Sequence, residues 1–154
     1  MEISLRPAAA EDEPFIRALI EEVVADDLGA HAWPEPVRLP LLDMQYRARR
    51  QGLRAAFPTA LEQIILREEQ AAGWMVVAPG TDEIRLVDIA VKPVFRGNGL
   101  AASCIRGLQT EAARAALPLR LSVARSSRAV DLYRRLGFEI SGGDEMRYAM
   151  QWSA

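Results

Sequence analysis

The sequence predicts an α/β protein of the α+β type, with a mixed, mostly antiparallel twisted sheet of about six or seven strands and about four helices. Two observations support this fold class. Three strand-like runs at residues 61–66, 73–78 and 84–91 follow one another with turn residues between them, which is typical of an antiparallel meander. A strand–helix–strand unit follows at residues 84–124, and a helical crossover of that length joins parallel neighbours.

The N-terminal part predicts one short strand and two helices. Residues 2–6 alternate in polarity, and residues 10–28 carry apolar side chains at helical spacing. Gly29 supplies the stop of that helix. The prolines and tryptophan of residues 31–40 predict a loop, and residues 41–57 predict the second helix.

The C-terminal part predicts alternating helices and strands. Its elements are a helix at about residues 99–116, a strand at 119–124, a short helix at 127–136, and strands at 138–140 and 147–152. Turn residues separate the strands of both meanders, at residues 68–72, 79–82 and 141–144. No internal repeat or linker interrupts the chain, so residues 1–154 are expected to form a single domain.

Composition limits the classes of partner and cofactor. Nineteen basic and 21 acidic residues leave a formal charge of −2, which is too balanced to make nucleic acid or an anionic membrane the main partner. Cys104 and His31 are single residues of their type, so we expect no internal disulfide and no metal. No apolar run approaches the roughly 18 residues of a membrane span, and a cytoplasmic location is expected.

A glycine-bearing loop at residues 96–101 directly follows a strand and opens a helix. At the start of a helix several amide protons lack an intrahelical partner, and the helix dipole leaves partial positive charge there. Glycines also let the backbone approach an anion closely, so the loop is expected to bind phosphate through its backbone. The alternative is that the two glycines only turn the chain.

Two segments resemble a known family. Residues 88–101, Asp-Ile-Ala-Val-Lys-Pro-Val-Phe-Arg-Gly-Asn-Gly-Leu-Ala, resemble the acyl-CoA-binding motif of the GNAT superfamily of N-acetyltransferases, with Arg96, Gly99 and Ala101 at its consensus positions. Residues 132–138, Leu-Tyr-Arg-Arg-Leu-Gly-Phe, are similar to the second signature of that family. The resemblance implies a GNAT-like sheet whose central parallel strands splay apart, with acetyl-CoA (coenzyme A) as cosubstrate.

The resemblance also implies which residues hold the cosubstrate. Backbone groups between the splayed strands would bond the pantetheine arm, and the loop amides would bind the diphosphate. The expected cofactor-binding residues are Ile89, Ala90, Val91, Arg96, Gly97, Asn98, Gly99, Leu100, Ala101 and Ser127. Relatives often carry glutamate and asparagine where this chain has Ala124 and Ser127, which puts the pantetheine contact in question rather than the fold.

Direct acetyl transfer to a primary amine in a ternary complex requires an acid and a base. Tyr133 is the expected catalytic acid for the departing CoA thiolate, and its alternative is a tyrosine packed on the buried helix face. Asp88 is the candidate base, with two alternatives: a strand aspartate that shapes the sheet, or a water chain in its place. Cys104 lies on the inner stripe of its helix and is expected to fill the core rather than act as a nucleophile.

The acceptor is expected to be a small-molecule or peptide amine, selected by residues 26–57. Asp26, Asp27, His31 and Trp33 lie in that stretch, and each can equally be an ordinary surface residue. A homodimer is also considered. The competing hypotheses are a non-catalytic acyl-CoA-binding sensor or complex subunit, and a plain interaction domain without affinity for CoA.

Overall fold

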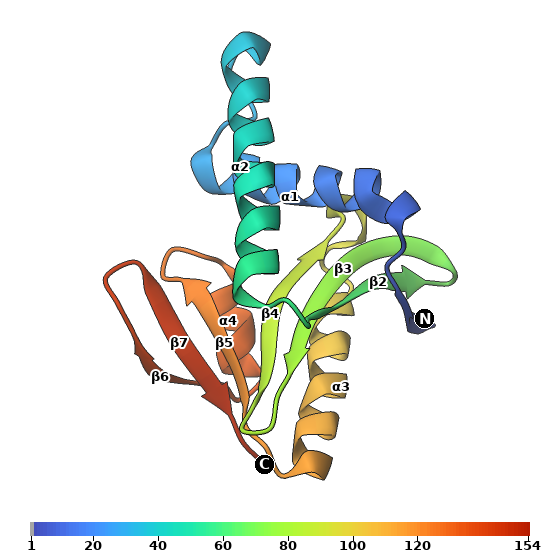
Figure 1. The fold of residues 1–154 in the computed structure, drawn as a ribbon, viewed down its shortest axis with the longest axis vertical. Helices are drawn as coiled ribbons and strands as arrows, with labels where there is room; N and C mark the ends of the chain where they lie inside the picture. The colour runs from blue at the N-terminus through green and yellow to red at the C-terminus, as the bar shows by residue number, and fades with distance from the viewer. Residues whose placement is uncertain (1) are drawn as a thin grey trace.

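The computed structural model describes residues 2–154, and Met1, the first residue of the predicted domain, lies outside them. Seven strands form one sheet in the order β1-β2-β3-β4-β5-β7-β6 (Figure 1). The strands are β1 (Ile3–Pro7), β2 (Leu61–Arg67), β3 (Gln70–Pro79), β4 (Ile84–Val91), β5 (Leu119–Ala124), β6 (Glu139–Gly143) and β7 (Arg147–Trp152). The helices are α1 (Glu13–Leu28), α2 (Glu35–Ala56), α3 (Leu100–Ala115) and α4 (Ala129–Arg135), with 3₁₀ turns η1 (Ala10–Asp12) and η2 (Pro93–Phe95).

The sheet confirms the predicted mixed topology. Every neighbouring pair is antiparallel except β4 and β5, which are parallel and are joined by α3. That parallel pair is registered only at Ile84 with Leu119 and at Arg85 with Arg120. Beyond these two positions the strands diverge toward their C-terminal ends, as a splayed pair requires.

Helices cover both faces of the sheet and create two cores. Side chains of β3 alternate between the faces. Met75 and Val77 belong to the core that also contains side chains of α3 and α4. Trp74 and Val76 belong to the core that contains side chains of α1 and α2. In Figure 1, α1 lies across the sheet and α2 rises past it, so that the N-terminal turns of α2 extend beyond the rest of the chain.

The predicted loop at residues 31–40 is wrong, because α2 already begins at Glu35. Pro36 lies in the first turn, where backbone amides have no intrahelical acceptor, so its missing N–H costs nothing. Pro40 lies one turn further and removes a single helical hydrogen bond. The prolines therefore mark the start of a helix rather than a loop.

Two predicted turns include residues that belong to strands. Only Glu68 and Glu69 connect β2 to β3, and both have left-handed backbone conformations with φ of 50° and 70°. Two-residue hairpins of this kind usually carry glycine or asparagine, so two glutamates gave no signal for a tight turn. Residues 70–72 consequently belong to β3, and residues 141–143, also assigned to a turn, belong to β6.

Among residues 2–154, none of the helices combines the length and the apolar composition that crossing a bilayer requires.

Candidate active site

The loop between η2 and α3 leaves a row of backbone amides free. Gly97 and Gly99 have φ of 80° and 76°, a conformation that favours glycine, and α3 begins at Leu100. The first helical bond back to the loop runs from the Ser103 amide to the Gly99 carbonyl, at 2.9 Å. Within residues 2–154, no backbone carbonyl accepts a hydrogen bond from the amides of residues 97–102. These amides point at an anion site on the positive end of α3.

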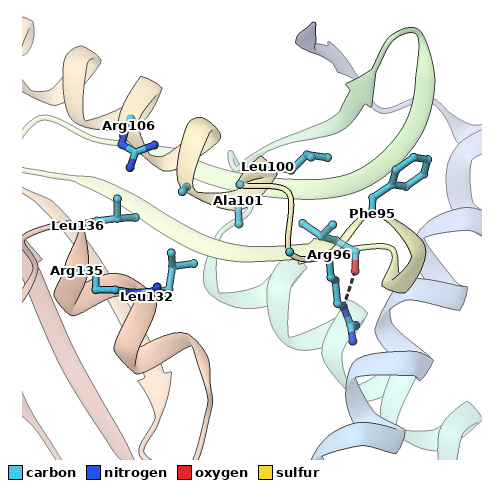
Figure 2. A pocket seen from close by; sticks show the side chains of 12 residues that line it. Phe95, Arg96, Leu100, Ala101, Arg106, Leu132, Arg135 and Leu136 are labelled. Atoms are coloured by element: carbon cyan, nitrogen blue, oxygen red, sulfur yellow. Dashed lines mark hydrogen bonds between the residues drawn. The ribbon is translucent and has the colours of Figure 1, made fainter. Parts of the chain in front are cut away.

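A cavity of about 450 Å³, here called the loop pocket, lies against this loop (Figure 2). A Cβ atom built at Gly97 or Gly99 would meet no atom within 4 Å, so the backbone is open to a ligand on that side. Arg106 of α3 and Arg135 of α4 also line the loop pocket and add positive charge. These two arginines could not be predicted as site residues, since nothing in their sequence spacing shows that α3 and α4 face one cavity.

Along β4, the backbone N–H and C=O groups of successive residues point alternately toward β3 and toward β5. The Lys92 amide donates to the Ala72 carbonyl at 2.7 Å, which makes this a hydrogen-bonded pair of the antiparallel ladder. Hydrogen-bonded pairs recur every second residue, so Ala90 forms such a pair with Trp74. The N–H and C=O groups of the alternate residues, Ile89 and Val91, point toward β5. Because β5 has diverged there, Ile89 and Val91 lack a strand partner on that side. The Ala90 backbone, also predicted to bind the ligand, is engaged with β3.

A second cavity, the wedge pocket, of about 730 Å³, follows this gap. It shares Val91, Arg96, Ala101 and Leu132 with the loop pocket. Ser127 lines it from the segment before α4, where its Oγ accepts a hydrogen bond from the Ala129 amide at 3.1 Å. The loop and wedge pockets therefore form one continuous groove.

A third cavity, the inner pocket, of about 590 Å³, continues from the wedge pocket on the side of α1 and α2. The two share a set of lining residues: Val23, Asp27, Ile89, Ser127, Ala129 and Tyr133. Asp88 and Ala124 line the inner pocket but neither the loop pocket nor the wedge pocket. Tyr133 therefore stands at the junction of the groove and the inner pocket, and Asp88 lies just beyond it.

Tyr133 is largely buried, with 7% of its surface exposed, and its ring lies 5.6 Å from that of Phe138. No protein group within residues 2–154 hydrogen bonds its hydroxyl, which faces the pockets. Burial raises the pKa of Tyr133, and the nearby Asp88 carboxylate raises it further, against the opposing charge of Arg147. The phenol is therefore protonated at neutral pH and has a proton to donate.

The Asp88 carboxyl group lies close enough to Tyr133 for its charge to act on the phenol, and its own pKa shifts in the direction a base needs. Burial raises the pKa of Asp88 above its ordinary value of 3.8. Arg49, the Ile89 amide and Arg147 oppose that shift. The Ile89 amide donates to Asp88 Oδ1 at 2.9 Å, which orients the carboxylate at the edge of the gap. A carboxylate with a raised pKa is a better proton acceptor than an exposed one.

Arg96 crosses the mouth of the groove. Its Nε donates to the Val91 carbonyl at 3.1 Å (Figure 2), and its Nη1 donates to Asp26 Oδ2 at 3.2 Å. Asp26 also lies 2.6 Å from His31 Nε2, and these partners hold the pKa of Asp26 below its usual range. Glu22, Asp26 and His31 place ligand atoms within 4.8 Å of one another, and the His31–Asp26 hydrogen bond accounts for that proximity.

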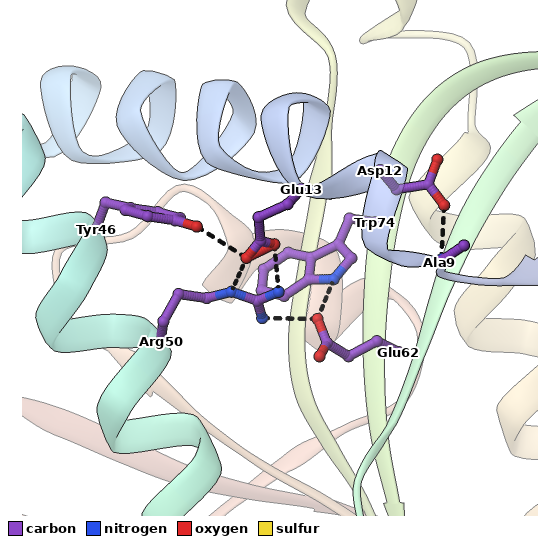
Figure 3. A network of polar contacts seen from close by, with 7 residues as sticks. All are labelled: Ala9, Asp12, Glu13, Tyr46, Arg50, Glu62 and Trp74. Carbon is purple, nitrogen blue, oxygen red and sulfur yellow. Dashed lines mark hydrogen bonds and ion pairs between the residues drawn. The ribbon is translucent and has the colours of Figure 1, made fainter.

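A buried arginine joins the helices to the sheet behind the inner pocket (Figure 3). Arg50 of α2 donates to both oxygens of Glu13 in α1 at 2.7 and 2.6 Å, and to Glu62 of β2 at 2.7 Å. Trp74 Nε1 donates to the same Glu62 oxygen at 3.0 Å, and Tyr46 donates to Glu13 at 2.8 Å. The network fixes the positions of α1 and α2 relative to β2 and β3.

The remaining residues named from the sequence lie outside the groove. His31 is exposed, and Trp33 packs against the core beneath α1 and α2. Cys104 is buried in the other core, and burial raises the pKa of its thiol to about 11, which confirms its expected place as a core residue.

Taken as a surface, the groove fits a long ligand with an anion at one end. Free amides and two arginines face the anion end, and the Ile89 carbonyl and the Val91 amide, which lack a strand partner, lie along the gap. The Ile89 amide and the Val91 carbonyl are already bonded, to Asp88 and Arg96. Tyr133 and Asp88 lie where that arm ends. The residues present therefore suit a diphosphate joined to a chain with amide groups, as in coenzyme A.

Comparison with known proteins supports this description. A family model described as an acetyltransferase (GNAT) domain matches residues 60–140. No curated protein sequence matches the chain at a significant level.

Three solved structures illustrate the shared fold. The PaiA N-acetyltransferase of Thermoplasma acidophilum, in complex with coenzyme A, has 15% identity and a TM-score of 0.75, covering 100% of each chain. The ribosomal-protein-S18-alanine N-acetyltransferase of Escherichia coli has 24% identity and a TM-score of 0.61, covering 99% of this chain and 94% of that one. A GNAT family acetyltransferase of Elizabethkingia anophelis with acetyl-CoA bound has 16% identity and a TM-score of 0.64, covering 99% and 98%.

Proposed function

The chain belongs to the GNAT family of acetyltransferases, and from that premise we propose that it transfers the acetyl group of acetyl-CoA directly to a primary amine. The observation that carries this proposal is the row of free amides at the opening of α3, connected by a continuous groove to Tyr133. The amides of residues 97–102 would bind the diphosphate, and the arm would lie between β4 and β5. Acetyl-CoA supplies the reactive thioester when bound.

The residues at the end of the groove supply the proton transfers. Asp88, directly or through water, accepts a proton from the acceptor amine so that its nitrogen can attack the acetyl carbonyl carbon. The C–N bond forms, and the C–S bond breaks. Tyr133 donates its phenolic proton to the departing thiolate. The new amide nitrogen then gives up its surplus proton, which restores the Tyr133 phenol. The raised pKa of each group supports its role, since a buried phenol holds its proton until a strong acceptor appears.

We further propose that residues 1–154 act as a single domain in the cytoplasm and need no metal for this reaction. One sheet that includes strands from Ile3 to Trp152 supports the single domain. The proton transfers above use only side chains, which supports a reaction without a metal. Whether two copies associate can be measured by light scattering on the purified protein.

Binding is tested first by thermal unfolding with acetyl-CoA. A ligand at 100 times its dissociation constant adds about 2.7 kcal/mol to the free energy of unfolding. For a chain of this length that corresponds to a rise in melting temperature of about 5 to 10 °C. The absence of any rise with acetyl-CoA or CoA would contradict the proposal at its first step.

Catalysis is tested by Tyr133→Phe in an assay of thiol release. Loss of the general acid lowers kcat by about 10²- to 10⁴-fold. The dissociation constant for acetyl-CoA and the melting temperature stay close to those of the parent, because the phenyl ring keeps its contact with Phe138. A Tyr133→Phe protein with full activity would show that Tyr133 only packs, and a parent that binds acetyl-CoA but acetylates no amine would indicate a non-catalytic binding protein.

A further inference from the structure

Two guanidinium groups in the inner pocket have no part in the proton transfers. Arg49 reaches the pocket from α2 and Arg147 from β7, and both line it together with Asp88 and Tyr133. Their positive charges lower the pKa of Asp88 against the effect of burial, and Arg147 also lowers that of Tyr133. Both arginines therefore lie within electrostatic range of the groups that would move protons.

Neither guanidinium has a hydrogen-bonded carboxylate among residues 2–154. Arg147 donates through Nε to Ser122 Oγ at 2.8 Å and through Nη2 to the Ser122 carbonyl at 3.0 Å, and both acceptors are neutral. Arg49 has one acidic neighbour, Asp27, whose oxygen lies 3.9 Å away, beyond hydrogen-bond distance. The Asp27 side chain is 57% exposed, so water screens that contact.

The neighbouring Arg50 provides the contrast. It is buried and pairs with two carboxylates, Glu13 and Glu62, through three of its five N–H groups, so its charge is already neutralised. The fold thus neutralises the arginine behind the pocket and leaves the charges of Arg49 and Arg147 available at its walls. Guanidinium groups bind carboxylate and phosphate through paired hydrogen bonds, which makes them suited to an anionic substrate group.

We propose that the amine acceptor carries an anionic group, a carboxylate or a phosphate, which Arg49 and Arg147 bind while the amine faces Asp88 and Tyr133. This inference rests on the proposed function and specifies its substrate class. The charged walls alternate in sign, with Asp27 and Asp88 beside the two arginines, and so match an acceptor with one positive and one negative end. A polyamine offers nothing for the guanidinium groups and is repelled by them.

The apolar wall of the pocket indicates the rest of the acceptor. Val23 of α1, Leu53 of α2 and Phe57, which follows α2, are among the apolar residues that line it. An amino acid or short peptide with an apolar side chain would place that side chain there. Leucine is accordingly the first probe, and leucinamide is its matched partner without the negative charge.

The first experiment compares matched acceptors with the unaltered protein, using thiol release from acetyl-CoA. We expect kcat/KM for leucine to exceed that for leucinamide by at least about tenfold, the loss expected for one charge-assisted hydrogen bond. Amidation lowers the pKa of the amine and increases its free-base fraction, so leucinamide would react faster if charge had no role. Phosphoethanolamine and ethanolamine form the second pair, and a preference for the phosphate compound would support the inference and identify phosphate as the group.

The second experiment uses Arg49→Gln and Arg147→Gln. Each should raise KM for the preferred anionic acceptor by about 10- to 100-fold. Removing either charge alters the pKa of Asp88 and so shifts kcat for both partners alike, whereas KM for the uncharged partner should change by less than about threefold. Arg54→Gln is the control, because Arg54 lies on the same helix, is exposed and does not line the pocket. The melting temperature and the dissociation constant for acetyl-CoA verify that each variant is folded.

The outcomes distinguish failure of the proposed transferase function from failure of the anionic-acceptor proposal. Absence of acetyl-CoA binding and of transfer to every amine would defeat the proposed function and this inference with it. Equal transfer to charged and uncharged partners, or arginine variants that behave like Arg54→Gln, would overturn the inference alone and leave the transferase intact.

Discussion

At the scale of single residues, Asp88 links activity to stability. Its folded pKa is raised, so the folded state binds the proton more tightly than the unfolded state. Below the unfolded pKa near 3.8 both states are protonated and no cost arises. As pH rises through the folded pKa, the buried carboxylate increasingly destabilises the fold. Asp88→Asn should therefore raise the melting temperature at pH 7, with little effect at pH 3.

The same substitution tests the base. If Asp88 accepts the proton, kcat/KM of the parent falls as the pH is lowered, with an apparent pKa above 3.8. Asp88→Asn should lower activity by about 10²- to 10⁴-fold and abolish this acid limb of the pH profile. Asp27→Asn is the control, since Asp27 lies at the exposed rim of the same pocket. A limb that survives in Asp88→Asn would assign the proton to a water chain.

Gly99 allows a prediction for the anion site. Its φ of 76° would cost an alanine about 1 to 2 kcal/mol, although no atom lies within 4 Å of the added Cβ. Gly99→Ala should therefore lower the free energy of unfolding by about that amount and weaken acetyl-CoA binding about tenfold, because the methyl group projects where the phosphate approaches. Gly107→Ala, in the middle of α3, should instead stabilise the protein by about 0.5 to 1 kcal/mol and leave binding unchanged.

At the scale of elements, the Arg50 network holds α1 and α2 over the sheet. Arg50→Leu removes the cation that bridges Glu13 and Glu62 and leaves each carboxylate with only a neutral donor, Tyr46 or Trp74. We expect the free energy of unfolding, measured by urea titration, to fall by about 3 kcal/mol. Arg47→Leu, which breaks an exposed pair with Asp43 on the same helix, should cost less than about 0.5 kcal/mol.

A rescue experiment distinguishes charge from packing. Adding Glu13→Gln and Glu62→Gln to Arg50→Leu should restore part of the lost stability, because the neutral amides no longer repel each other across β2 and α1. An Arg50→Leu protein as stable as the parent would show that water already solvates these carboxylates. Arg50 and Trp74 of this network line the inner pocket, so acceptor KM should change more than acetyl-CoA affinity.

At the scale of the whole molecule, the groove runs between two halves of the sheet that meet only through the first two positions of β4 and β5. A ligand in the groove would connect the two halves with hydrogen bonds that the protein itself leaves unmade. We expect acetyl-CoA to slow hydrogen exchange at the amides of residues 97–102 and at Val91. The β6–β7 hairpin, at the far edge of the sheet, serves as the internal control. Protection confined to that hairpin would place the ligand elsewhere.

Much of this architecture was predicted from local patterns. The meander, the crossover helix α3 and the strand β5 match their predicted residues closely, since each has a clear hydrophobic period and flanking turn residues. The start of α2 was missed because Pro36 and Pro40 were interpreted as loop residues. The turn at Glu68 and Glu69 was missed because neither residue prefers a left-handed backbone.

Some residues of the candidate site could likewise be predicted from the sequence and others could not. Residues 96–101 and Tyr133 could be named from the sequence, because each belongs to a contiguous motif whose local geometry follows from its own residues. The arginines Arg49, Arg106, Arg135 and Arg147 could not. Each comes from a different element, and an arginine-rich chain offers no local sign of which guanidinium groups will face a cavity.

By itself the sequence determined the order of the elements and the strand–loop–helix segment with free amides, because hydrophobic period and glycine placement act over a few residues. Only the tertiary structure decided where β4 and β5 part, which strand each β4 backbone group faces, and which charges meet in the inner pocket. Those features depend on the register of strands and the packing of helices far apart in the chain, where pairing is set by the sum of many contacts rather than by any single segment.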